Sequence, residues 1–222
     1  MVFFLLPWSS RQSRINTVNR DLWEVENRFR GLDPLRRSLI SEFGVKTRPL
    51  APVWRRYRGK FWEELCLWAL PGRVVREIEE KGLVLSPLFG VLGVGDAIPE
   101  YPVRWEWKFN GSDLLSFWRR HLEGVIGDLL RGSVVFDFAG SRERSVIKLP
   151  EDCIRVFFEY YRAGNRVRNS SAHRAYTLRY IVEMGVGLDD LGRINFLDYR
   201  VKEISQNGNT VKVVMEGEGR YI

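Results

Sequence analysis

Short apolar runs alternate with helically spaced apolar residues along most of the chain. The runs at 1–6, 83–85 and 134–138 have the length and composition of buried strands. Between and after them, apolar residues recur at helical spacing, which predicts helices over 20–29, 34–43, 60–69, 73–81, 112–131 and 170–184. This alternation predicts an α/β fold in which helices surround a mixed central sheet.

Polar–apolar alternation and turn residues add strands and hairpins to this prediction. Residues 103–109 alternate apolar with charged side chains, which predicts a strand with one solvated face, and 53–57 is a shorter candidate strand. Hairpins are predicted for 154–168, across Ala163-Gly164-Asn165, and for 199–216, around the polar turn at 206–209. No linker interrupts the pattern, so we expect residues 1–222 to form one domain with antiparallel hairpins late in the chain.

The chain is basic, and its basic residues are mostly arginine. It has 35 Lys and Arg against 28 Asp and Glu, a net charge of +7, and 28 of the basic residues are Arg. The guanidinium group binds phosphate through two parallel hydrogen bonds and stacks on aromatic rings, which indicates a nucleic-acid partner. The alternative is that these arginines occupy ordinary solvated positions.

Several basic residues cluster beside aromatic ones, a pattern typical of grooves that follow a nucleic-acid backbone. The candidate nucleic-acid-binding residues are Arg11, Arg14, Arg55, Arg58, Lys60, Arg166, Arg168, Arg174 and Arg179.

No common catalytic, cofactor or metal-binding motif is present, so the sequence predicts no cofactor and no metal. Cys66 and Cys153 have no metal-type spacing, which favours buried thiols in a cytoplasmic protein. The opening run 1–6 is too short to span a membrane and lacks the basic start of a signal peptide. We expect no membrane association, and a monomer.

The most informative segment is 83–101, where a short buried strand ends at Ser86 and is followed by Gly90, Asp96 and Tyr101. In open α/β sheets, ligand sites form just outside the carboxyl ends of the strands. Ser86, Asp96 and Tyr101 are therefore candidates for catalysis. Asp96 has an alternative interpretation as a turn residue bonded to nearby backbone amides, and His173 is the better functional candidate of the two histidines.

Seven segments, in order, match the motifs of a known family. They are Leu5-Leu6-Pro7-Trp8-Ser9, Tyr57–Phe61 with Leu65, Ser86–Leu92 with Asp96, Ile98 and Tyr101, Leu115–Trp118, Asp137–Ala139, Arg174 with Arg179-Tyr180-Ile181, and Phe196 with Tyr199. On these segments the chain resembles the YaaA family of peroxide-stress proteins.

The resemblance implies one mixed α/β domain, a basic cleft that binds DNA, and a role in limiting oxidative damage. It adds Ser9, Gly90 and Asp137 to Ser86, Asp96 and Tyr101 as expected pocket residues. His173, which Arg174 follows, is a further expected pocket residue on the basis of its basic surroundings. The chain departs from the family pattern at four positions, where the family has Arg, Arg, Asn and Lys and this chain has Gly93, Pro102, Asp137 and Ser171.

Two hypotheses follow. The first is a DNA-binding protein of the peroxide stress response that binds through an Arg-and-aromatic cleft without turnover. The second is an enzyme acting on a nucleotide or nucleobase at a pocket around Ser86, Asp96 and Tyr101, with Arg174 holding a phosphate. Convergence of Ser86, Asp96, Tyr101 and Arg174 in one concave pocket would favour a functional site, whereas scattered positions would favour folding roles, as in a plain structural or interaction module.

Overall fold

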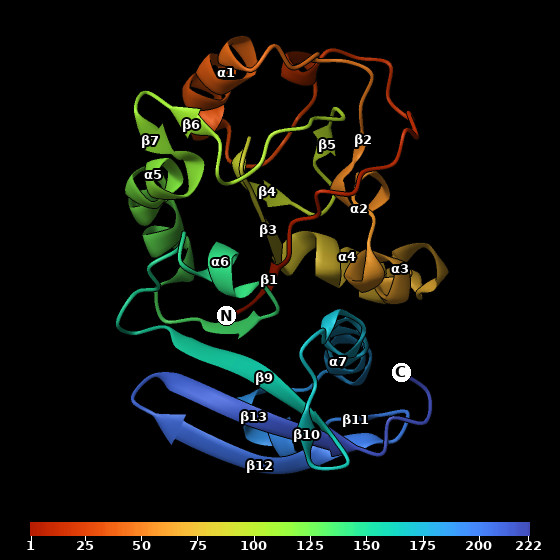
Figure 1. Cartoon of the computed structure of the whole chain (residues 1–222). Helices are drawn as coiled ribbons and strands as arrows, with labels where there is room; N and C mark the ends of the chain where they lie inside the picture. The colour runs from red at the N-terminus through yellow and green to blue at the C-terminus, as the bar shows by residue number, and fades with distance from the viewer.

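A nine-stranded mixed sheet forms the centre of the molecule, whose residues 1–222 are all described by a computed structural model (Figure 1). Its strands follow the order β11 (Asn195–Phe196), β12 (Tyr199–Asn207), β13 (Thr210–Gly217), β9 (Ile154–Arg162), β8 (Val134–Asp137), β1 (Val2–Leu6), β3 (Gly82–Ser86) and β4 (Gly90–Gly93), and β10 (Asn165–Arg166) pairs with β9. The neighbours from β13 through β9, β8 and β1 to β3 are parallel, and the other pairs are antiparallel. The predicted mixed sheet and both late hairpins are confirmed.

Helices cover this sheet, as the periodicity predicted. They are α1 (Asp33–Glu42), α2 (Val53–Arg56), α3 (Lys60–Leu65), α4 (Gly72–Lys81), α5 (Leu114–Leu130), α6 (Ser141–Arg144) and α7 (Ser171–Met184). Figure 1 shows α7 between α3 and the half of the sheet formed by β9, β12 and β13. One hydrophobic core of 58 buried residues runs through the whole chain, which makes the fold a single α/β domain.

Short 3-10 helices and two small strand pairs complete the fold. The helices are η1 (Leu22–Glu24), η2 (Arg30–Leu32), η3 (Leu67–Ala69) and η4 (Leu188–Arg193). The pairs are β2 (Ala51–Pro52) with β5 (Ala97–Ile98), and β6 (Lys108–Phe109) with β7 (Ser112–Asp113). None of the helices combines the length and the apolar character that crossing a bilayer requires.

The predicted helix at 20–29 is wrong. In this segment, hydrogen bonds with side chains and with residues distant in the sequence replace the backbone hydrogen bonds of a helix. Asp21 accepts from the Trp23 amide at 3.1 Å, which leaves only the short η1. Asn27 exchanges two hydrogen bonds with the Ala97 backbone, at 2.9 and 2.8 Å, and the Arg28 amide donates to Asp96 at 2.9 Å. The apolar spacing gave no indication of these long-range contacts.

Two predicted strands are also wrong or much shorter than expected. Residues 53–56 form α2, in which Pro52 fixes the entry and the Tyr57 amide donates to the Val53 carbonyl at 2.8 Å. In 103–109 only β6 pairs with another strand. The predicted faces nevertheless hold, since Val103 and Trp105 are buried while the charged residues between them are exposed.

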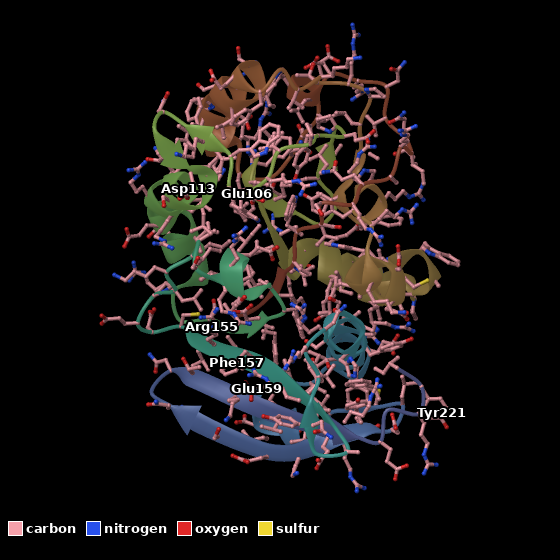
Figure 2. All side chains as sticks on the ribbon, viewed as in Figure 1. Glu106, Asp113, Arg155, Phe157, Glu159 and Tyr221 are labelled. Carbon is pink, nitrogen blue, oxygen red and sulfur yellow. The ribbon has the colours of Figure 1, made fainter.

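Three parallel strands end at one edge of the sheet, which we call the carboxyl edge. β1 lies between β3 and β8, so Leu6, Ser86 and Asp137 end side by side there. On β9, Arg155, Phe157 and Glu159, labelled in Figure 2, share one half-buried face, while Val156, Phe158 and Tyr160 face the core. The ends of β3 and β8 therefore place Ser86 and Asp137 at the edge of the sheet where α/β proteins bind their ligands.

Candidate functional site

Three buried hydroxyl groups form a hydrogen-bonded chain at the carboxyl edge, which we call the hydroxyl cluster: Ser86, Tyr57 and Tyr101. The Tyr101 hydroxyl lies 2.8 Å from Ser86 Oγ and 2.5 Å from the Tyr57 hydroxyl. Ser86 Oγ also accepts from the Phe89 amide at 3.2 Å. Burial raises the pKa of Tyr101 to about 12 and holds that of Tyr57 well above its ordinary value, so both phenols are neutral and serve as hydrogen-bond donors.

Glu143 is an acid at this edge that the sequence analysis missed. It lies on α6 just after β8, is 8% exposed, and accepts from the Gly140 amide at 3.0 Å. Burial raises its pKa to about 7, against the lowering effect of the Gly140 and Trp8 amides and of the Arg174 charge. A glutamate three residues past a helix start that follows a buried strand is the signal that would have found it.

The segments that carry the family resemblance meet around this cluster. Tyr57 and Tyr101 come from two of them and share a hydrogen bond. Indole N–H groups connect further segments. Trp62, next to the second segment, donates to the Pro7 carbonyl of the first at 3.1 Å, and Trp118 donates to the Pro87 carbonyl at 2.8 Å. The Arg174 guanidinium donates to the Phe138 carbonyl at 2.7 Å.

Asp96 does not join this cluster. β4 runs antiparallel to β3, so it returns the chain to the other end of β3, where Gly93 pairs with Leu83. There the Asp96 carboxylate accepts from the Arg28 amide at 2.9 Å and the Gly93 amide at 2.8 Å. Burial raises its pKa although these two bonds lower it. The structure thus supports the turn interpretation of Asp96.

The other expected pocket residues lie near the carboxyl edge but are committed to local contacts. Asp137 is bound by the Arg144 and Arg155 guanidinium groups. Ser9 donates to the Arg58 carbonyl. Gly90 packs against the Trp118 ring.

His173 is enclosed between two tyrosines on the sheet. Its ring lies 5.1 Å from that of Tyr160 and 4.6 Å from that of Tyr199, and neither ring nitrogen has a hydrogen-bond partner. Burial lowers its pKa to about 4, so the imidazole is neutral. It does not line the cleft described next.

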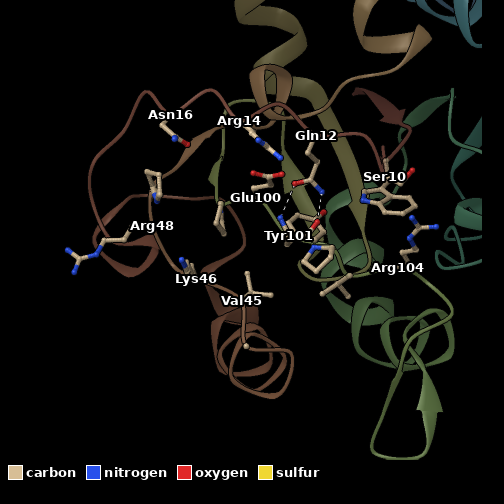
Figure 3. A pocket seen from close by; sticks show the side chains of 16 residues that line it. Ser10, Gln12, Arg14, Asn16, Val45, Lys46, Arg48, Glu100, Tyr101 and Arg104 are labelled. Carbon is tan, nitrogen blue, oxygen red and sulfur yellow. Dashed lines mark hydrogen bonds between the residues drawn. The ribbon is translucent and has the colours of Figure 1, made fainter.

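A cleft of about 740 Å³ opens directly beside the hydroxyl cluster (Figure 3). Tyr101 lines the cleft together with Trp8 and also belongs to the hydroxyl cluster, so these two residues form the boundary between the cleft and the buried cluster. Its charged lining residues are Arg14, Lys46, Arg48, Glu100 and Arg104. Of the residues predicted from sequence, only Arg14 and Tyr101 line this cleft.

The structure brings two of the predicted basic clusters together on one face. The loop after β1 runs against the segment from α2 to α3, since the Ser13 amide donates to the Arg56 carbonyl at 2.7 Å and the Arg58 amide to the Arg11 carbonyl at 2.9 Å. We call the resulting surface, with the cleft cations, the basic face; its members are Arg11, Arg14, Lys46, Arg48, Arg55, Arg58 and Arg104. None of them forms an ion pair within 4 Å.

The remaining predicted cations are placed differently. Lys60, Arg166 and Arg179 pair with Glu64, Glu159 and Glu183. Arg168 follows β10 at the far hairpin, and Arg174 is part of the carboxyl edge.

A simple count along the chain would have located the segment that holds six of the seven residues of the basic face. Residues 1–60 hold 13 Lys and Arg against 5 Asp and Glu, a net charge of +8, whereas the whole chain carries +7. Residues 61–222 are therefore close to neutral. Clusters of neighbouring arginines were a weaker signal, because a cluster can be neutralised by acids from other parts of the fold.

A family model described as "Peroxide stress protein YaaA" matches residues 19–205. The chain belongs to the YaaA family of peroxide stress proteins. No match was found among curated proteins. The family assignment agrees with the convergence of the resembling segments at the carboxyl edge.

Two of the four departures from the family pattern have a basic residue close by. A side chain at Gly93 would meet Arg28 Cδ at 2.5 Å, so Arg28 already fills that space. Pro102, which stands where the family has Arg, lines the cleft together with Arg104, so a cation is present two residues further along the chain. At the other two positions, Ser171 accepts from Arg174 at 3.3 Å and Asp137 binds two arginines.

Proposed function

We propose that this YaaA-family protein binds DNA through the basic face and its cleft, as part of the peroxide stress response. The observation that carries the proposal is the concentration of charge: a net +8 lies in the first 60 residues, and seven cations of the basic face have no acidic partner. Unpaired cations on one face release counterions when they bind phosphates, which favours association with a polyanion.

Aromatic groups give the face a second means of holding nucleic acid. The half-buried Trp8 lines the cleft, and Arg55 lies 4.7 Å over the ring of Trp54. Arginine with interleaved aromatic rings suits a strand whose phosphates follow the cations while its bases stack.

Fluorescence anisotropy at a series of salt concentrations tests this proposal. We expect affinity for labelled DNA to fall steeply with salt, and Arg14→Gln and Arg48→Gln each to reduce the slope of log K against log salt by about 1. Arg166→Gln and Arg168→Gln, at the far hairpin, are the matched controls and should leave the slope unchanged.

Two results would contradict the proposal. One is equal weak binding to duplex, bubbled and single-stranded DNA and to heparin, which would indicate a nonspecific polyanion effect. The other is a loss of slope in the far-hairpin variants as large as in the cleft variants.

A second candidate function is an enzyme acting on a nucleotide or nucleobase, and Glu143 is the observation that favours it. An acid with a pKa of about 7 suits proton transfer near neutral pH, and it lies with the hydroxyl cluster behind the Trp8–Tyr101 boundary of the cleft. In this candidate function, Glu143 has the catalytic role that the sequence predicted for Asp96. Product analysis after incubation with nucleotides and short DNA tests it, with Glu143→Gln expected to abolish turnover while DNA binding persists.

A further inference from the structure

Glu100 is the single acidic residue of an otherwise cationic cleft. It shares the lining with Arg14, Lys46, Arg48 and Arg104. It is exposed, accepts no hydrogen bond and forms no ion pair within 4 Å. Figure 3 shows Glu100 among the side chains that line the cleft, together with Arg14 and Tyr101.

The segment that carries Glu100 is held rigidly. Gln12 binds the Tyr101 backbone on both sides, donating to its carbonyl at 2.9 Å and accepting from its amide at 3.1 Å. The buried Arg56 donates to the Ile98 carbonyl at 3.3 Å, and Pro99 and Pro102 restrict the backbone between these anchors. The carboxylate is therefore presented to the cleft by a backbone with little freedom.

A carboxylate among phosphate-binding cations weakens phosphate binding unless it accepts hydrogen bonds from the ligand. The nucleobases offer such donors. Guanine alone presents two adjacent donors, N1–H and the N2 amino group, whose spacing matches the two oxygens of a carboxylate. Both lie on the Watson–Crick edge, which is free only in an unpaired base.

We propose that the cleft holds an unpaired guanine whose Watson–Crick edge is bound by Glu100. This inference rests on the proposed DNA binding and adds a base specificity to it. Arg14, Lys46 and Arg48 contact the flanking phosphates, and the Trp8 side of the cleft accommodates the base. A volume of about 740 Å³ is sufficient for one nucleotide.

The test compares thymidine oligomers that carry one central guanine, hypoxanthine, adenine or cytosine. We expect the wild-type protein to bind the guanine oligomer roughly tenfold tighter than the adenine or cytosine ones. Hypoxanthine, which lacks the N2 amino group, should fall between them.

Glu100→Gln should act in two directions at once. It removes the guanine preference because an amide cannot accept two hydrogen bonds from adjacent donors. It leaves binding to the all-thymidine oligomer equal or tighter because a negative charge near the phosphates is gone. Glu106→Gln is the matched control, since Glu106 is also exposed but lies outside the cleft lining and pairs with Arg142, and it should keep the preference.

The outcomes separate the two proposals. A wild-type protein that binds DNA with no preference or with a preference for cytosine overturns the guanine site and leaves DNA binding intact. The same holds if Glu100→Gln, folded by its thermal transition, keeps the guanine preference. Failure to bind any oligomer even at low salt would instead overturn the proposed function.

Discussion

Glu143 and His173 should make opposite contributions to the pH dependence of stability. Burial raises the pKa of Glu143 from an ordinary 4.5 to about 7, so between these values the folded protein binds a proton that the unfolded chain lacks. Its contribution to stability is fully present below pH 4.5 and is lost as the pH rises through about 7. Burial lowers the pKa of His173 from an ordinary 6.5 to about 4, so its contribution is present above pH 6.5 and is lost as the pH falls through about 4.

The two effects overlap between pH 4.5 and 6.5 and are of similar size. Each pH unit is worth about 1.4 kcal/mol for one differentially bound proton, so each group contributes about 3 kcal/mol across this window. Because the slopes have opposite signs, we expect the contributions of Glu143 and His173 to the free energy of unfolding to nearly cancel there.

Urea unfolding at several pH values, with single variants, separates the two titrations. Glu143→Gln leaves His173 alone, so the stability of this variant should rise with pH across the window. His173→Phe leaves Glu143 alone and keeps a ring between Tyr160 and Tyr199, so its stability should fall with pH. A Glu143→Gln profile parallel to that of the wild-type protein would refute the reasoning, because it would mean that Glu143 titrates alike in both states.

Three further substitutions test the structural roles assigned above, each by urea or thermal unfolding. Gly90→Ala should cost on the order of 2–4 kcal/mol, because φ is +74° and the added Cβ would lie 2.6 Å from the Trp118 ring; a neutral effect would contradict this packing. Arg56→Met should cost about 3 kcal/mol by leaving the half-buried Ser13 carbonyl and the buried Ile98 carbonyl without donors, whereas exposed Arg55→Met should cost little. Asp96→Asn should cost about 1–2 kcal/mol, because one amide oxygen replaces two acceptors, and should leave DNA affinity unchanged; a lost affinity would return Asp96 to the binding site.

The sequence predicted the elements whose structure depends on local pattern. Strands β1, β3 and β8, helices α1, α4, α5 and α7 and both late hairpins follow from apolar period and turn residues. Residues 20–29 fail for a reason that no local pattern contains, because their polar groups pair with Asp96 and Ala97.

The candidate site was predicted in part, and strand direction explains the division. Ser86 and Tyr101 meet because the chain leaves β3 at the carboxyl edge and Tyr101 returns to it. Asp96, between them in sequence, lies at the opposite end of β3 because β4 is antiparallel. The order of residues along a motif does not reveal such a reversal, and so Asp96 was expected in the pocket while Glu143 was missed.

Exposure distinguishes the two proposed functions. Proton transfer to a ligand requires an acid in contact with it, but Glu143 is 8% exposed and Ser86 is fully buried, and neither lines the cleft. The groups that do line it are unpaired cations, an unpartnered carboxylate and two aromatic side chains, which suit phosphates and a base. Catalysis would require Tyr101 to move and break its 2.8 Å bond to Ser86, whereas binding requires no rearrangement of the cluster. The geometry therefore favours a binding cleft that rests on a rigid hydroxyl cluster.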